Sequence, residues 1–448
     1  MIVFFQMIIS VICIFCLGYY LIVLIKDGEF ISFPSMIIAL AILDFYIPAF
    51  VGALTGGYKN STHYPIRDNT TYFYATILYS IFLLLFFFGY SLNIRFRYRT
   101  TRISDKSLYD RKWVIKEGLL SFFFITMFSL IVLNLFLEYK ALGNWEAFYK
   151  YKITREYLGA IEFNSPLSRI VQLSSGFNQT ILFITCAIGF LNYKSLKRKF
   201  FWHFLAPFFT FLLILTTLYR GTILNFVCMI VVCIQLSNGT KSIYLSKKAQ
   251  NSIKRLVFAG AIVFLAYGTV RTSLNNSRWD IVQTNKDSFF EMISNTFGTT
   301  LVAFSRCIQY VSEGGKLLYG STIYEMFLAF IPRSIMPSKP VQYGIISIDL
   351  AMGMPSTSMS AVSAPGELIA NFGIFGLLFV PIIGIAFKQL SYMRDSNRYC
   401  YFYAAIVSSL VTTTLWMGFT GFFSTLKYSF LYIFVLCLVV KKRRSKES

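Results

Sequence analysis

The chain has 448 residues, of which 56% are hydrophobic, 18% aromatic and only 14% charged. Soluble domains average about 25% charged residues, so this composition excludes a water-soluble globular protein and requires lipid as a solvent. The formal net charge of +22 would indicate a nucleic-acid partner in a soluble protein; here we assign it to cytoplasmic loops and expect no nucleic acid.

Apolar windows long enough for a spanning helix, about 20 residues, recur along the chain. We predict helices at 2–25, 33–56, 71–92, 117–137, 167–191, 200–219, 221–236, 256–271, 366–387, 399–419 and 422–440. The first window lacks a basic leading segment and a small-residue cleavage site, so we interpret it as a retained span and not a signal peptide. The predicted fold class is all-α, a polytopic transmembrane helical bundle of about 11 spans.

Lys and Arg residues predict the orientation, because they concentrate in cytoplasmic loops. The tail KKRRSKES is strongly basic, which places the C-terminus in the cytoplasm. Alternating backwards makes the cytoplasmic loops 26–32, 93–116, 192–199, 237–255 and 388–398, which with the tail hold more than half of the 42 basic residues. Eleven spans then put the N-terminus outside. The segment 289–311 is open to three interpretations, an amphipathic exterior helix, a re-entrant segment or a further span that would change the count.

Two predicted exterior loops are long, 138–166 and 272–365. A connection as long as the second is uncommon and is usually functional. Its middle, YGSTIYEMFLAFIPRSIMPSKPVQYG, is partly apolar and broken by prolines, which predicts short helices lying against the membrane face. The predicted regions are a transmembrane bundle of about 8 spans at 1–271, the large exterior loop at 272–365, and closing helices with the basic tail at 366–448.

Several chemistries lack their residues. The two histidines, His63 and His203, fall on opposite faces of the predicted topology, and no Cys/His cluster has metal-ligand spacing. The sequence contains no phosphate-binding P-loop, no Gly-rich dinucleotide fingerprint and no Asp-x-Asp pair to hold a divalent ion on a nucleotide sugar. No Ser/His/Asp set lies on one side of the membrane. We therefore predict no metal and no cofactor.

Arginines remain on the predicted outer face. Arg220 lies in the tight turn TLYRGT and Arg333 lies in IPRSIMPSKP; Arg271 ends the eighth predicted helix, and Arg278 would share its face if that helix continued. A guanidinium grips phosphate oxygens bidentately and stays charged. Several such groups at one face would bind a lipid-linked pyrophosphate and stabilise charge on a leaving phosphate. The alternative for each is an interfacial anchor.

Two carboxylates complete the candidates. Asp44 lies inside the second span, where an ionisable side chain is a functional hypothesis, although it could simply pair with an arginine. Glu367 begins the ninth predicted helix and is the best-placed base for an acceptor hydroxyl; the alternative is a helix N-terminal acid favoured by the macrodipole. The stretch 352–366, rich in small and hydroxyl residues, either lines a sugar site or is a flexible loop.

The order of these features resembles a known family. A helical hairpin with YRG is followed by an exterior loop with GSTIYEMFLAFIPRSIMPSKP, then by PGELIANFGIFGLL and two closing helices. Arg333 and Gly344 are also separated by ten residues, a spacing described in such proteins. Over about 215–440 the chain is similar to the Wzy-type polymerases of O-antigen and capsular oligosaccharide repeat units, whereas the first 200 residues match only in hydropathy.

The resemblance implies a GT-C-like membrane glycosyltransferase in the bacterial cytoplasmic (inner) membrane, active at its periplasmic face. The substrate would be an undecaprenyl-pyrophosphate-linked oligosaccharide, polymerised into O-antigen or capsular-type polysaccharide as in lipopolysaccharide biosynthesis. Arg220, Arg271 and Arg333 would hold the pyrophosphate, with Glu367 as candidate base. Membrane lipid is an expected partner, and the resemblance leaves room for a regulator of polysaccharide chain length.

Alternatives from other classes stay open. An O-antigen ligase typically has a histidine in its large exterior loop, and the loop at 272–365 has none. A transporter or flippase of lipid-linked oligosaccharide would need polar residues along the bundle interior and usually shows internal repeats. No repeat is visible, and Asp44 is the only strongly polar residue that we expect deep in a span. A membrane scaffold or sensor would not need arginines gathered on one face.

Overall fold

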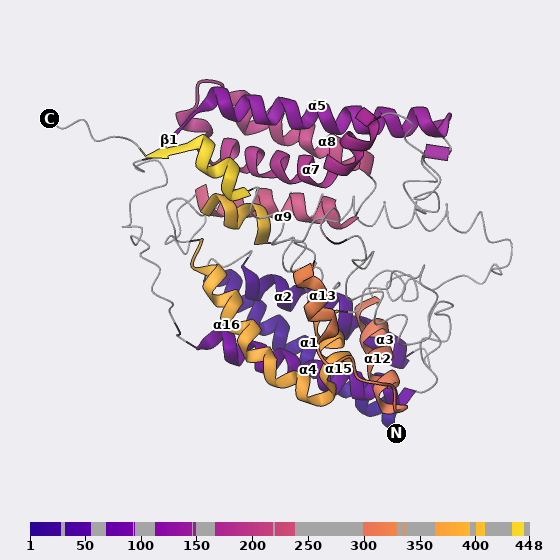
Figure 1. Ribbon diagram of the computed structural model, residues 1–448. Helices are drawn as coiled ribbons and strands as arrows, with labels where there is room; N and C mark the ends of the chain where they lie inside the picture. The colour runs from indigo at the N-terminus through magenta and orange to yellow at the C-terminus, as the bar shows by residue number, and fades with distance from the viewer. Residues whose placement is uncertain are drawn as a thin grey trace. The chain divides into compact units, whose positions relative to one another are not determined.

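Figure 1 shows the computed structural model of the protein, which describes residues 1–27, 32–54, 69–92, 94, 113–145, 147–148, 166–217, 220–237, 299–328, 336, 363–394, 400–407 and 432–442. Within these residues the chain is almost entirely helical, as the apolar windows predicted. The helices form two compact units, and each is described by itself. The predicted division into regions 1–271, 272–365 and 366–448 stays a prediction.

The first unit begins with α1 (Ile2–Lys26), a helix with the polarity of a membrane protein. Its three buried residues include two polar ones, Gln6 and Ser10, whereas Phe4 and Phe15 are 63% and 74% exposed. The Gln6 side-chain amide donates to the Ala49 carbonyl at 3.4 Å. A helix that turns its polar groups inward and its phenylalanines outward is suited to lipid and not to water.

The second apolar window folds as three consecutive helical pieces. They are α2 (Phe33–Ala41), the π-helical turn η1 (Ile42–Tyr46) and α3 (Ile47–Leu54). Ser32 caps α2 in a reciprocal arrangement with Ser35, and Pro34 occupies the first turn, where its missing N–H costs nothing. The π-helical turn contains Asp44.

The first unit also contains one helix before residue 100 and several elements between residues 299 and 391. They are α4 (Asn69–Ser91), α12 (Thr299–Ser312), α13 (Ser321–Leu328), α15 (Ala364–Phe372), the 3-10 helix η5 (Gly373–Phe379) and α16 (Val380–Ser391). The helix α12 packs on α4, α15 and η1. Of the open segment 289–311, the structure describes only 299–311, which lie in this helix. The three interpretations of the whole segment therefore stay predictions.

Close contact between α4 and α16 organises the first unit (Figure 1). A Cβ on Gly384 would overlap the Phe86 carbonyl oxygen and the Tyr90 amide nitrogen, and a Cβ on Gly89 would overlap the main chain of Pro381. The Tyr90 hydroxyl bonds the Ser391 hydroxyl at 2.7 Å, so the two helices end together and run parallel. Small residues let two helix backbones approach in this way inside a membrane.

The helix directions in the first unit follow an alternating topology. Cys13 meets Ser80, and Tyr20 meets Phe87, so α1 and α4 run parallel. The Gln6 to Ala49 bond makes α2–α3 antiparallel to α1. One end of this unit thus holds the starts of α1, α4 and α15, and the other holds the ends of α1, α4 and α16.

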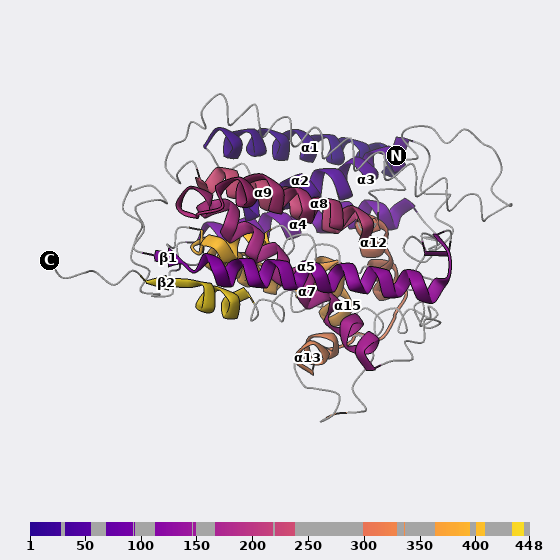
Figure 2. The same cartoon turned by 90° about the horizontal axis from the view of Figure 1, so that it is seen from above.

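The second unit is built on α5 (Glu117–Leu142), α7 (Pro166–Asn192), α8 (Ala206–Thr217) and α9 (Arg220–Ser237). Two short turns, the 3-10 helix η3 (Tyr193–Ser195) and the π-helical η4 (Phe201–Leu205), connect α7 to α8. Figures 1 and 2 show α5 running along α7, and the two pack closely. Trp202, fully buried, lies edge-on to Phe124 and covers Gly189, where a Cβ would overlap its ring.

One short ribbon of two strands accompanies the helices. The strands β1 (Trp113–Ile115) and β2 (Val440–Lys442) pair antiparallel, with Trp113 opposite Lys442. The Lys116 amide continues the pairing to the Val439 carbonyl at 3.0 Å. Residues 113–115, just before α5, and residues 440–442, where the basic tail begins, therefore meet at the start of α5.

Five described helices are long and apolar enough to cross a bilayer, namely Ile2–Lys26, Phe33–Leu54, Asn69–Ser91, Glu117–Leu142 and Ala364–Ser391. Two shorter apolar helices are Phe201–Thr216 and Asn225–Ser237. The predicted helix 256–271 lies outside the described residues, and the last two windows are helical at 400–407 and 432–439. Several apolar helices of this length suggest a membrane protein.

We predict that Gly384→Ala destabilises the protein by about 1–3 kcal/mol, because the added methyl must displace backbone atoms of α4. The apparent melting temperature of the purified protein in detergent measures the effect. Gly18→Ala is the control, since nothing lies within 4 Å of a Cβ there. Equal melting temperatures for both variants would contradict the tight α4–α16 contact.

Candidate functional site: a buried carboxylate held between α13 and α15

The start of α15 positions Glu367. Ser363 caps the helix by accepting from the Gly366 amide at 3.3 Å, and Pro365 lies in the first turn. Glu367 follows in that turn, where the helix macrodipole favours a negative charge. Its side chain is only 1% exposed. The prediction that Glu367 lies at a helix N-terminus is confirmed. The sequence did not indicate that its side chain is buried.

Three side chains form a chain of hydrogen bonds around this carboxylate. The Thr322 hydroxyl donates to Glu367 Oε1 at 2.8 Å and accepts from Asn371 Nδ2 at 2.8 Å. Asn371 Nδ2 also donates to the Glu367 carbonyl at 2.7 Å, one turn back in α15. Thr322 and Asn371 are fully buried. The cluster of Glu367, Thr322 and Asn371 therefore joins α13 to α15 through polar contacts shielded from solvent.

The turn before α13 docks on the same helix. The amides of Leu318 and Tyr319 donate to the carbonyls of Ala370 and Asn371 at 3.1 and 3.0 Å, and the Gly320 amide donates to Asn371 Oδ1 at 2.9 Å. Tyr319 has φ 47° and Gly320 has φ 83°. The left-handed conformation costs Tyr319 about 1–2 kcal/mol, and such strain concentrates at sites where surrounding contacts impose it.

Ser363 adds a second strained position beside the cluster. Its φ is 64°, although it carries a side chain, and it is fully buried. Both ends of the cluster, the turn at Tyr319 and the cap at Ser363, thus hold non-glycine residues in the left-handed region. The Glu367 carboxylate accepts from the Thr322 hydroxyl and lies at a helix N-terminus, an arrangement that can orient a proton acceptor.

Asp44 occupies a different position in the first unit. It is 4% exposed, lies in the π-helical turn η1, and accepts a hydrogen bond at Oδ2 from the Thr300 hydroxyl at the start of α12. Next to it, Phe45 stacks on Tyr79 with ring centroids 3.8 Å apart. π-Helical turns within α-helices are frequent at functional sites. Asp44 is therefore a buried polar tie between the second apolar segment and α12.

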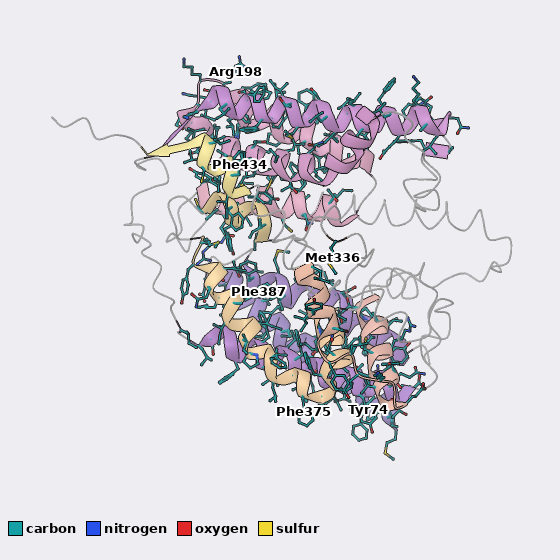
Figure 3. The ribbon with its side chains drawn as sticks, in the orientation of Figure 1. Tyr74, Arg198, Met336, Phe375, Phe387 and Phe434 are labelled. Atoms are coloured by element: carbon teal, nitrogen blue, oxygen red, sulfur yellow. The ribbon has the colours of Figure 1, made fainter. Side chains whose placement is uncertain are left out.

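The predicted arginines are only partly covered by the structure. Arg220 is the first residue of α9, and its side chain lies outside the description. Arg271, Arg278 and Arg333 lie outside the described residues. Figure 3 labels Met336, the only described residue between 329 and 362. The arginine site for a pyrophosphate and the lining role of 352–366 stay predictions.

Sequence reasoning missed several polar residues. The four-residue spacing of Glu367 and Asn371 in APGELIANF could have indicated a shared helix face. Thr322 and Thr300 carried no such signal, because their partners lie far away in the chain. In the second unit, Asn134 Nδ2 donates to Glu138 Oε1 at 3.0 Å, and both residues are buried. This pair in α5 corrects the expectation that Asp44 is the only strongly polar residue deep in a span.

No protein-family model, curated protein or solved structure matches the chain. Among the described residues, no three His, Cys, Asp or Glu side chains gather as a metal site would require.

We predict that Thr322→Val lowers the stability of the protein by about 1–3 kcal/mol, because it leaves buried Glu367 and Asn371 each short of one partner. Thermal unfolding in detergent measures the loss. Thr322→Ser keeps the hydroxyl and should retain most of the wild-type melting temperature. A valine variant as stable as the serine variant would show that the cluster contributes little to folding.

Proposed function

We propose that the protein is a membrane glycosyltransferase that polymerises undecaprenyl-pyrophosphate-linked oligosaccharide repeat units into O-antigen or capsular-type polysaccharide. The observation that carries the proposal is the fixed carboxylate of Glu367, buried at the start of an apolar helix and locked to an adjoining turn by Thr322 and Asn371. In this reaction a base held in a fixed position must accept the proton of the acceptor sugar's hydroxyl.

In the proposed reaction, an acceptor sugar hydroxyl attacks the anomeric carbon of the donor. The carbon–oxygen bond to the pyrophosphate breaks, undecaprenyl pyrophosphate leaves, and the hydroxyl proton passes to Glu367. Arg220, Arg271, Arg278 and Arg333 hold the pyrophosphate and stabilise its developing charge. Guanidinium groups can supply this stabilisation themselves, so the proposal includes no metal and no cofactor.

The proposed setting is a GT-C-like bundle of about eleven spans in a bacterial cytoplasmic membrane, with the C-terminus in the cytoplasm and the reaction at the periplasmic face. Two features support this orientation. In the first unit, Lys388 lies 4.7 Å from the Tyr90 ring at the end opposite to the start of α15. In the second unit, the loop before α5 pairs with the basic tail.

We predict that Glu367→Gln lowers chain elongation by about 100-fold or more, the contribution typical of a general base. The amide oxygen can still accept from Thr322, so the fold is expected to survive. The assay incubates purified protein with a synthetic undecaprenyl-pyrophosphate repeat unit and resolves the product ladder.

Glu313→Gln, at an exposed carboxylate after α12, is the matched control and should elongate normally. Arg333→Ala should abolish elongation while the protein level in the membrane stays normal. Normal ladders from the Glu367→Gln variant would remove Glu367 as the base, and normal ladders from Arg333→Ala would remove that arginine from the pyrophosphate site.

A flippase of lipid-linked oligosaccharide is the second candidate, and buried Asp44 in a π-helical turn favours it. In that case the purified protein in vesicles would move a labelled lipid-linked repeat unit across the bilayer without lengthening it. Asp44→Asn should then slow the movement at least about tenfold, since a transport site loses its charge. A product ladder with no lipid movement would exclude this candidate.

A further inference from the structure

A cluster of basic side chains lies at the end of the second unit where α5 begins. Its members are exposed and come from two segments: Lys116, Lys194, Lys197, Arg198 and Lys199, named here the basic corner. Figure 3 shows Arg198 projecting from this end. Hydrogen bonds fix the backbone of the basic corner: Glu117 accepts from the Lys197 amide at Oε2 (2.7 Å) and from the Arg198 amide at Oε1 (2.9 Å).

The Glu117 contacts have a direct electrostatic consequence. The Glu117 carboxylate accepts hydrogen bonds from two backbone amides, and these bonds fix the conformation of the loop. The side chains of Lys197 and Arg198 stay exposed. Lys116 precedes Glu117 and is held by its bond to Val439. The corner therefore presents five exposed cations around Glu117, which is an attractive surface for anions.

An apolar ladder continues directly from the basic corner. Phe200, Phe204 and Phe208 follow one face of the helix, with ring centroids 5.7 and 5.9 Å apart and nearly parallel planes. They are 68%, 54% and 44% exposed. A soluble anion would need only the cations. A phospholipid has a charged headgroup that matches the basic corner and acyl chains that match the adjoining phenylalanine ladder.

We propose that the basic corner and the ladder Phe200–Phe204–Phe208 form a binding site for an anionic phospholipid. The headgroup phosphate lies among Lys197, Arg198 and Lys199, where basic side chains near a membrane surface attract anionic lipids. An acyl chain lies along the phenylalanine ladder. This site is independent of the proposed polymerase chemistry, because it uses none of the residues assigned to that reaction.

The test adds phosphatidylglycerol, or phosphatidylcholine with the same acyl chains, to the purified full-length protein in detergent and counts bound lipid by native mass spectrometry. Wild type should prefer phosphatidylglycerol. The variant K197Q/R198Q/K199Q should bind it at least about tenfold more weakly, because each basic group near the surface contributes. The control K26Q/K140Q/K316Q loses the same charge at exposed positions elsewhere and should bind as wild type does.

The phenylalanine ladder is tested separately. F200A/F204A should also weaken phosphatidylglycerol binding, whereas F15A/F88A, at exposed phenylalanines on α1 and α4, should not. Deacylated glycerophosphoglycerol should compete poorly. Equal loss in both triple variants would show an effect of net charge alone, and full competition by the deacylated headgroup would show a soluble-anion site; either result overturns the proposal.

Discussion

The interior of a bilayer supplies no hydrogen-bond partners, and the described elements follow from that constraint. Helices satisfy their own backbone, and several buried side-chain hydroxyls are satisfied within them. Thr76, Thr185 and Thr210 are fully buried, and each donates to the carbonyl four residues earlier at 2.7–2.9 Å. The same constraint turns Gln6 of α1 inward while Phe15 of that helix stays exposed. Helix contacts then depend on shape, as at Gly89 and Gly384, more than on hydrophobic burial.

The two π-helical turns coincide with polar groups, one in each unit. The turn η1 contains Asp44, and the turn η4 contains His203 and follows the basic corner. The 3-10 helix η5, which follows α15, is apolar. A wider or tighter turn changes which backbone groups are satisfied and re-aims the neighbouring side chains. Regular helix forms most of each unit, and the π-helical turns place the side chains of Asp44 and His203.

The apolar windows predicted most helix positions, because length and hydropathy alone select a spanning helix. The window 117–137 corresponds to α5, which continues to Leu142, and Gly143 with φ 78° ends it. The single window 366–387 is three pieces, since Gly373 with φ 59° interrupts the helix after Phe372. The ribbon of β1 and β2 could not be predicted, because three-residue strands acquire their partners only in the folded chain.

The candidate site was also predictable from the sequence only in part. Glu367 was predictable from its place in APGEL, since helix starts favour acids. Thr322 was not, because its contact depends on a turn in which Tyr319 adopts a left-handed conformation against its own preference. The arginine positions were inferred from chemistry, and the structure describes only the backbone of Arg220 among them.

The docking of residues 318–322 on α15 limits how any site at Glu367 can work. Leu318, Tyr319, Gly320 and Thr322 each bond to α15, so this part of the exterior segment moves with the helix as one body. A side chain on a helix that several hydrogen bonds anchor has its position set before any ligand binds, so little entropy is lost on binding. Because the turn is anchored at four residues, any adjustment of this region to a bound ligand must come from residues beyond it.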